Sequence, residues 1–162
     1  MLKSSSPKRI RLLDGQFAIV ASRYNSRYVD GMLVRAVREL KRAGAAKIQV
    51  VRVPGAFEIP AVAAKLAQDS QLSAGRLSAI ICLGVIFQGE TSHAQHVGWG
   101  VTHALAQIQV QHKIPVVHGV FIFEKEEQAR VRCLGRQFNR GAEAAHTALE
   151  MARVMKSLSN AK

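Results

Sequence analysis

One short segment combines a glycine turn, two hydroxyls and a histidine at the point where a helical pattern begins. It spans residues 89–93 (GETSH) and follows an apolar, β-branched run. Unpaired backbone amides at the start of a helix attract anions, so these amides and the hydroxyls could hold a phosphate without a lysine. His93 could move protons beside that phosphate, because imidazole titrates near neutral pH. The same residues also suit a plain turn and helix cap, and the segment alone leaves both interpretations open.

A second segment, residues 53–60 (VPGAFEIP), surrounds an aromatic ring and a carboxylate with backbone amides. This combination suits a flat, polar heterocycle. Glu58 could accept hydrogen bonds from hydroxyl or ring N–H groups, and Tyr24, which follows an earlier apolar run, could stack on the ring. The alternative is that Phe57 belongs to the core and that Glu58 is a first-turn acid favoured by the helix dipole. Considered singly, the segment favours this plainer alternative.

Apolar runs alternate with helical patterns along the chain. Such alternation requires crossover connections, which give parallel strands with helices on both faces. The predicted fold is therefore an α/β, three-layer α/β/α sandwich with a four-stranded parallel sheet, flavodoxin-like in architecture. The third and fourth runs lack an alternating polar face, and both are expected to be central strands buried on both sides. Strands are predicted at 17–21, 48–53, 79–85 and 116–121, and helices at about 28–43, 59–69, 93–111, 125–136 and 141–158.

Three residues mark predicted helix ends, and the strand ends mark where a ligand should bind. Gly44 suits a left-handed C-cap, Pro60 a first helical turn and Asn139 an N-cap. In open parallel sheets, ligands sit outside the carboxyl ends of the strands. Function is therefore expected at four junctions, which are residues 23–25, 54–58, 84–93 and 118–124.

The composition predicts one domain. The chain has 162 residues, 48% of them apolar, which is enough for a single core, and no linker divides it. Residues 1–11 carry serines, a proline and four cations, and are expected to form a mobile basic arm before a domain at 12–162. No stretch approaches the roughly 20 uncharged residues of a membrane span, and residues 1–13 lack the apolar middle of a secretory signal. A cytoplasmic location is predicted.

Charge, cysteines and histidines raise three further hypotheses. The formal charge of +12 makes nucleic-acid binding an alternative, although the cations are spread along the chain and few aromatics lie among them. Cys82 and Cys133 form no CxxC unit and are interpreted as buried free thiols. His96 and His103 share a helical face with His93, but the absence of HExxH and of a nearby acid argues against a metal site.

Five segments together resemble the lumazine synthase family. The elements G-A-[FY]-E-[IL]-P and G-x-T-x-H correspond to residues 55–60 and 89–93, and residues 23–25 (RYN) are similar to R-[FW]-N. The likeness continues through residues 127–132 (EQARVR) and ends at 139–145 (NRGAEAA), similar to N-[KR]-G-x-E-A-A. These segments stand in order and at similar spacing, so the resemblance covers about residues 14–158.

The resemblance implies a transferase of riboflavin biosynthesis that works without a cofactor or metal. It would condense 5-amino-6-(D-ribitylamino)uracil with 3,4-dihydroxy-2-butanone 4-phosphate, releasing phosphate and water and forming 6,7-dimethyl-8-ribityllumazine, the penultimate step. His93 is the implied proton carrier. The implied substrate-binding residues are Tyr24 and His118 on the pyrimidine, Ala56, Phe57 and Glu58 on its ribityl and ring side, Val85, Ile86 and Phe87 at the pocket edge, and Glu90, Thr91 and Arg132 around the phosphate.

The resemblance also implies an assembly. Lumazine synthases place each active site between neighbouring subunits of a homopentamer, so Tyr24 and His93 of one chain are expected to face His118 and Arg132 across or near an interface. Residues 134–141 show no insertion relative to the shell-forming bacterial members, which favours twelve pentamers closing into an icosahedral capsid as the larger assembly. A functional link to riboflavin synthase is a further implication.

The chain departs from the family pattern at four positions. His93 is followed by Ala94 and Gln95, where the family commonly has an aromatic residue and an acid. His118 stands where phenylalanine is frequent, and Arg140 where lysine is common. These departures bear on the proton relay more than on the substrates. A non-catalytic flavin or lumazine binder on the same fold is therefore a second hypothesis, which the presence of His93 and Arg132 opposes.

Overall fold

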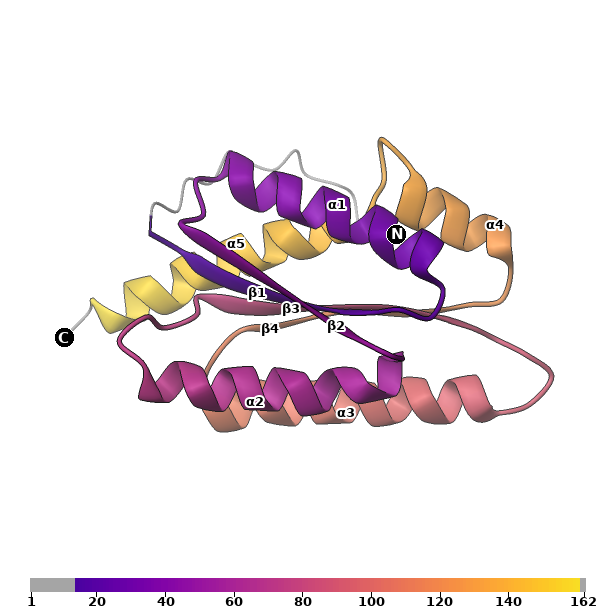
Figure 1. The fold of residues 1–162 in the computed structure, drawn as a ribbon, viewed down its shortest axis with the longest axis horizontal. Coiled ribbons are helices and arrows are strands. Elements are labelled where there is room, and N and C mark those ends of the chain that lie inside the picture. Colours follow the sequence, from indigo (N-terminus) through magenta and orange to yellow (C-terminus); the bar gives the residue numbers. More distant parts are fainter. Residues whose placement is uncertain (1–13, 161–162) are drawn as a thin grey trace.

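The computed structural model describes residues 14–160, which form one parallel sheet between two layers of helices. The predicted mobile arm at 1–11 lies outside the described residues. The strand order is β2-β1-β3-β4, and all neighbouring pairs are parallel. Helices α1 and α5 cover one face and α2 and α3 the other, as Figure 1 shows, which confirms the three-layer prediction. The bounds are β1 Gln16–Ser22, α1 Ser26–Arg42, β2 Lys47–Val53, α2 Ile59–Leu72, β3 Ala79–Phe87, α3 His93–His112, β4 Val116–Phe123 and α5 Arg140–Ser159.

The apolar runs become strands because both faces of the sheet are covered. β1 and β3 lie in the middle, where Phe17 to Ala21 and Ala79 to Val85 are buried. The prediction that the fourth strand is central is wrong, because β4 forms an edge of the sheet and exposes His118 and Ile122. An apolar run indicates that helices cover both faces of a strand, but it carries no information on whether a strand lies on each side.

The three predicted helix-end residues act as expected. Gly44 follows α1 with a φ of 86°, a left-handed conformation that glycine adopts without strain. Pro60 lies in the first turn of α2. Asn139 caps α5, and its Oδ1 accepts hydrogen bonds from the amides of Gly141 at 2.9 Å and Ala142 at 3.3 Å.

The helix predicted at 125–136 is shorter and irregular. It consists of α4 (Glu126–Ala129) followed by a π-helical turn, η2 (Arg130–Leu134). The chain leaves this turn at Gly135, where a Cβ atom would lie 2.4 Å from the Val131 carbonyl oxygen. Helix α4 is fastened to α1, because the Tyr28 hydroxyl on α1 donates a hydrogen bond to the Glu126 carboxylate on α4. That bond is also the main reason why the pKa of Tyr28 is raised.

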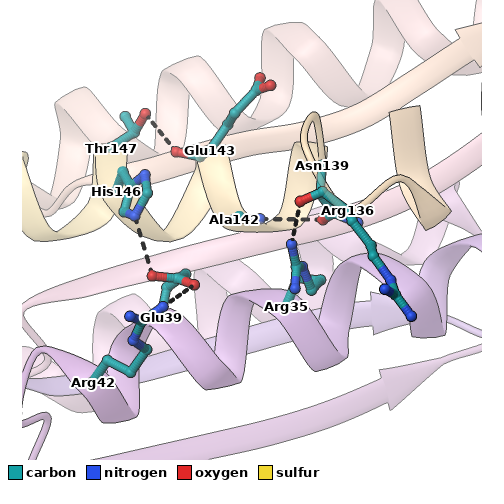
Figure 2. A network of polar contacts seen from close by, with 9 residues as sticks. All are labelled: Arg35, Glu39, Arg42, Arg136, Asn139, Ala142, Glu143, His146 and Thr147. Atoms are coloured by element: carbon teal, nitrogen blue, oxygen red, sulfur yellow. Dashed lines mark hydrogen bonds and ion pairs between the residues drawn. The ribbon is translucent and has the colours of Figure 1, made fainter. Parts of the chain in front are cut away.

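Helices α1 and α5 approach so closely that only glycine fits at one contact. A Cβ on Gly141 would lie 1.9 Å from the Met32 carbonyl oxygen. Polar contacts flank this crossing, as Figure 2 shows, with Glu39 lying 3.4 Å from His146 and 3.5 Å from Arg42. Arg35 donates to the carbonyl oxygen of Arg136 at 2.5 Å. The loop between η2 and α5 is thereby held against α1.

Both cysteines are free and buried, as predicted. Burial raises the pKa of Cys82 to about 12 and that of Cys133 to about 11, so both thiols stay protonated at neutral pH.

None of the helices in residues 14–160 combines the length and apolarity needed to cross a membrane.

Candidate active site

Backbone and side-chain hydrogen bonds join the first three predicted junctions. The amide of Tyr24 donates to the Pro54 carbonyl oxygen at 3.0 Å, which ties the end of β1 to the end of β2. The side-chain Nδ2 of Asn25 donates to the Val85 carbonyl oxygen at 2.8 Å, which ties the same turn to β3. Asn25 has a φ of 56°, a left-handed conformation that asparagine tolerates better than most residues. Segments far apart in the sequence are therefore held side by side at the carboxyl edge of the sheet.

An open cavity of about 780 Å³ lies at this edge, beside the start of α3. Tyr24 and Phe57 both border it and are 70% and 64% exposed. The alternative that Phe57 belongs to the core is therefore wrong. Two exposed rings at the rim of a cavity with both apolar and polar lining residues suit the faces of a flat, polar heterocycle. The lining residues are Tyr24, Asn25, Gly55, Ala56, Phe57, Glu58, Val85, Ile86, Phe87, His93, His96 and Val97.

Glu58 is oriented by the turn that precedes it. Its Oε2 accepts a hydrogen bond from the Gly55 amide at 2.8 Å, across the single 3-10 turn η1 (Ala56–Glu58). The Tyr24 ring lies against the same glycine, since a Cβ on Gly55 would lie 2.9 Å from the Tyr24 Cδ2 atom. The PGAFE segment therefore brings a fixed carboxylate and an aromatic face to one wall of the cavity.

The loop before α3 is fastened to the sheet by Gln88. The Gln88 amide donates to the Phe123 carbonyl oxygen at 2.9 Å, and its side chain donates to the carbonyl oxygens of Gly89 and Thr91 at 2.8 and 2.9 Å. Helix α3 begins at His93, as predicted, with no side-chain cap from Ser92. Glu90 and Thr91 are exposed in this loop, adjacent to the cavity but outside its lining. The loop thus presents hydroxyls and first-turn amides beside the pocket, an arrangement suited to an anion.

Two of the predicted site residues lie away from this cavity within one chain. His118 is the third residue of β4 rather than at its carboxyl end, so the fourth predicted junction is wrong at that position. Its Nε2 lies 3.0 Å from the Thr102 hydroxyl on α3, and burial lowers the pKa of His118, which keeps the imidazole neutral at pH 7. Arg132 is exposed on η2.

The cavity includes four residues that the sequence analysis did not assign to the site. Asn25 belongs to the motif RYN, and only the structure shows that its side chain ties the first junction to the third. Gly55 belongs to the motif PGAFEIP, and only the structure shows that it lies against the Tyr24 ring. His96 and Val97 follow His93 by three and four residues, the helical spacing that places side chains on one face. Helical spacing from His93 was therefore the signal that could have found them.

The lining of the cavity has few charged or metal-binding side chains. Its described lining contains neither lysine nor arginine, and Glu58 is its single acid. Among residues 14–160 there is no cluster of three histidine, cysteine or acidic side chains that could hold a metal ion. His103, which shares a helical face with His93, has its Nδ1 2.8 Å from the Trp99 carbonyl oxygen and does not line the cavity.

The chain is similar in sequence to one family of known proteins. The family model described as 6,7-dimethyl-8-ribityllumazine synthase matches residues 14–156. The protein named 6,7-dimethyl-8-ribityllumazine synthase in Halorhodospira halophila (strain DSM 244 / SL1) is 39% identical over 151 residues, covering 92% of this chain and 94% of that relative. Both similarities span the three junctions and the helices that hold them. The chain therefore belongs to the 6,7-dimethyl-8-ribityllumazine synthase family.

Proposed function

We propose that this chain catalyses the formation of 6,7-dimethyl-8-ribityllumazine in riboflavin biosynthesis. It condenses 5-amino-6-(D-ribitylamino)uracil with 3,4-dihydroxy-2-butanone 4-phosphate and releases phosphate and water. The observation that carries the proposal is the cavity in which Tyr24, Phe57, Glu58 and His93 meet. Family membership gives the reaction, and the cavity supplies an aromatic wall, an oriented carboxylate and an imidazole for it.

The pyrimidine and the sugar phosphate occupy different parts of the site. Tyr24 stacks on the pyrimidine, while Ala56, Phe57 and Glu58 line its ribityl side and the end of β3 forms the pocket edge. The phosphate lies at the loop before α3, where Glu90 and Thr91 offer backbone and hydroxyl donors. His93 moves protons between the two substrates. Much of the acceleration comes from holding two reactants together, which can replace a large part of the entropic barrier.

A second subunit completes the site. The described lining holds no lysine or arginine, and one substrate carries a phosphate dianion, so a cation from a neighbouring chain would add a charge-assisted contact to those made by the loop's amides and hydroxyls. Arg132 supplies that cation and His118 contacts the pyrimidine, each from a neighbouring chain. This arrangement requires an oligomer, and we propose a homopentamer whose subunits share their active sites, with twelve pentamers closing into a shell. The enzyme acts in the cytoplasm and hands its product to riboflavin synthase.

The direct test mixes both substrates with the purified protein and follows the absorbance and fluorescence of lumazine. The expected result is a rate proportional to protein concentration and well above that of the protein-free mixture. Omitting either substrate should abolish the signal. A rate equal to the protein-free mixture would reject the proposed enzyme, and tight binding of lumazine without acceleration would favour a binding protein instead.

A further inference from the structure

The six histidines of the chain divide into two groups by their hydrogen bonds. Four have a ring nitrogen close to a fixed polar group: His103 at the Trp99 carbonyl oxygen, His112 at Gln71, His118 at Thr102 and His146 at Glu39. Within residues 14–160, the rings of His93 and His96 have no such partner. Both of these unpaired imidazoles line the cavity.

His93 and His96 lie one turn apart at the start of α3. Side chains three residues apart on a helix are neighbours, with Cβ atoms about 5–6 Å apart. Both histidines are exposed, and no acid among the described lining residues is bonded to either ring, since the one acid, Glu58, bonds the Gly55 amide. The position after Ala94, where the family commonly has an acid, is Gln95. The cavity therefore contains a pair of imidazoles rather than an imidazole tuned by a carboxylate.

The proposed reaction moves protons at two carbons of the sugar phosphate. After the amine and the ketone have formed an imine and water has left, a base removes the proton on C3, and the C–H electrons form the C2=C3 bond of an enamine. The enamine nitrogen lone pair then re-forms the C2=N bond, the C2=C3 electrons form a C3=C4 bond, and phosphate leaves with the electrons of the C4–O bond. The resulting enol gains a proton at C4, which becomes a methyl group, and loses its hydroxyl proton. The second amine attacks the new C3 ketone, and water is lost. One proton must be taken and another delivered at adjacent carbons.

We infer that His96 is a second catalytic acid–base group, which shares these two proton transfers with His93. This inference rests on the proposed function. Imidazole both accepts and donates protons near neutral pH, so one ring can take the C3 proton while its neighbour delivers the proton to C4. Within residues 14–160 of one chain, neither ring has to be freed from a structural hydrogen bond before it acts. The pair performs the relay that a histidine and a carboxylate would otherwise perform.

The test compares His96→Asn with a matched variant on the same helix, His103→Gln, which lies outside the cavity. His96→Asn should lower kcat about tenfold to a hundredfold, because positioned acid–base groups contribute on this order or somewhat more and His93 still offers one imidazole. KM for both substrates should change less than kcat. One limb of the pH profile of kcat/KM should flatten, and added imidazole should restore part of the rate of His96→Ala. His103→Gln should stay within about twofold of the unchanged protein.

Three outcomes would overturn the inference. These are a kcat of His96→Asn equal to that of His103→Gln, a change confined to KM, or an unaltered pH profile with no rescue by imidazole. Circular dichroism and sedimentation establish that each variant folds and assembles, and His96→Gln replaces His96→Asn if the latter does not fold. If the unchanged protein itself forms no lumazine, the proposed function fails. An active unchanged protein with an equally active His96→Asn rejects the role of His96 alone.

Discussion

His93 is the first residue of α3 and lines the cavity in which we propose that the substrates bind. His93→Ala should slow lumazine formation by roughly tenfold to a thousandfold, because the loss of one proton-transfer group has about this effect. Pyrimidine affinity, measured by fluorescence titration, should persist because Tyr24 and Glu58 remain in place. Appreciable activity should also remain, since the two substrates are still held together. An unchanged rate would remove His93 from the mechanism.

Replacing Arg132 tests whether this side chain supplies the positive charge that binds the phosphate. Arg132→Ala should raise KM for the sugar phosphate by about ten- to a hundredfold, the equivalent of one charge-assisted hydrogen bond. Pyrimidine affinity should change little. The matched control is Arg130→Ala on the same turn, because Arg130 already bonds both carboxylate oxygens of Glu127 at 2.7 and 2.6 Å. Equal weakening of both substrates in Arg132→Ala would mean that this arginine is structural.

The crossing of α1 and α5 depends on Gly141, which belongs to the NRG motif that helped to identify the family. A Cβ at this position would overlap the Met32 backbone, so Gly141→Ala must push the two helices apart. The free energy of unfolding should fall by about 1–3 kcal/mol or more, the usual cost of overpacking. Urea unfolding measures this change, with every variant at the same subunit concentration because assembly contributes to apparent stability.

Gly75→Ala is the control for this helix crossing. Its added Cβ would lie 3.1 Å from the Nε2 atom at the flexible end of the Gln16 side chain, which can move aside. Its unfolding free energy should therefore change by about 0.5 kcal/mol or less, as at most surface positions. Equal destabilisation by the two substitutions would show that α1 and α5 do not need the close approach. The same crossing positions the loop between η2 and α5, so the Gly141 variant should also weaken phosphate binding.

Large apolar side chains are exposed on several elements of residues 14–160, and a subunit interface would bury some of them. We expect an active homopentamer, and the closing of twelve pentamers into a shell is the larger assembly expected. Sedimentation velocity and light scattering at moderate salt measure both. An active species with the mass of one chain would contradict the shared site, whereas pentamers without larger particles would reject only the shell. The exposed residues are Tyr24, Val34, Val50, Phe57, Leu72, Trp99, Val110, Ile122, Val131, Phe138, Val154 and Leu158.

The sequence by itself determined the layers of the fold and most of one wall of the site. The four apolar runs and the helical patterns between them require crossovers, and crossovers bring the carboxyl ends of parallel strands to one edge. The first three junctions were therefore predictable from periodicity alone. Tyr24, Phe57, Glu58 and His93 stand at those junctions, and all four line the cavity. The motifs added the reaction, which periodicity cannot supply.

Only the tertiary structure decided the order of the strands and the surroundings of each side chain. β4 is as apolar as a central strand yet forms an edge, because neighbouring strands are chosen by packing over the whole sheet and not by one run of residues. The helix expected at 125–136 is interrupted by the π-helical turn η2 and ends at Leu134. His96 and His103 share one helical face in the sequence, but one lies in the cavity and the other is bonded to its own helix. The strand order and the place of His96 in the cavity depend on contacts between segments that are distant in the chain, and local sequence patterns do not encode them.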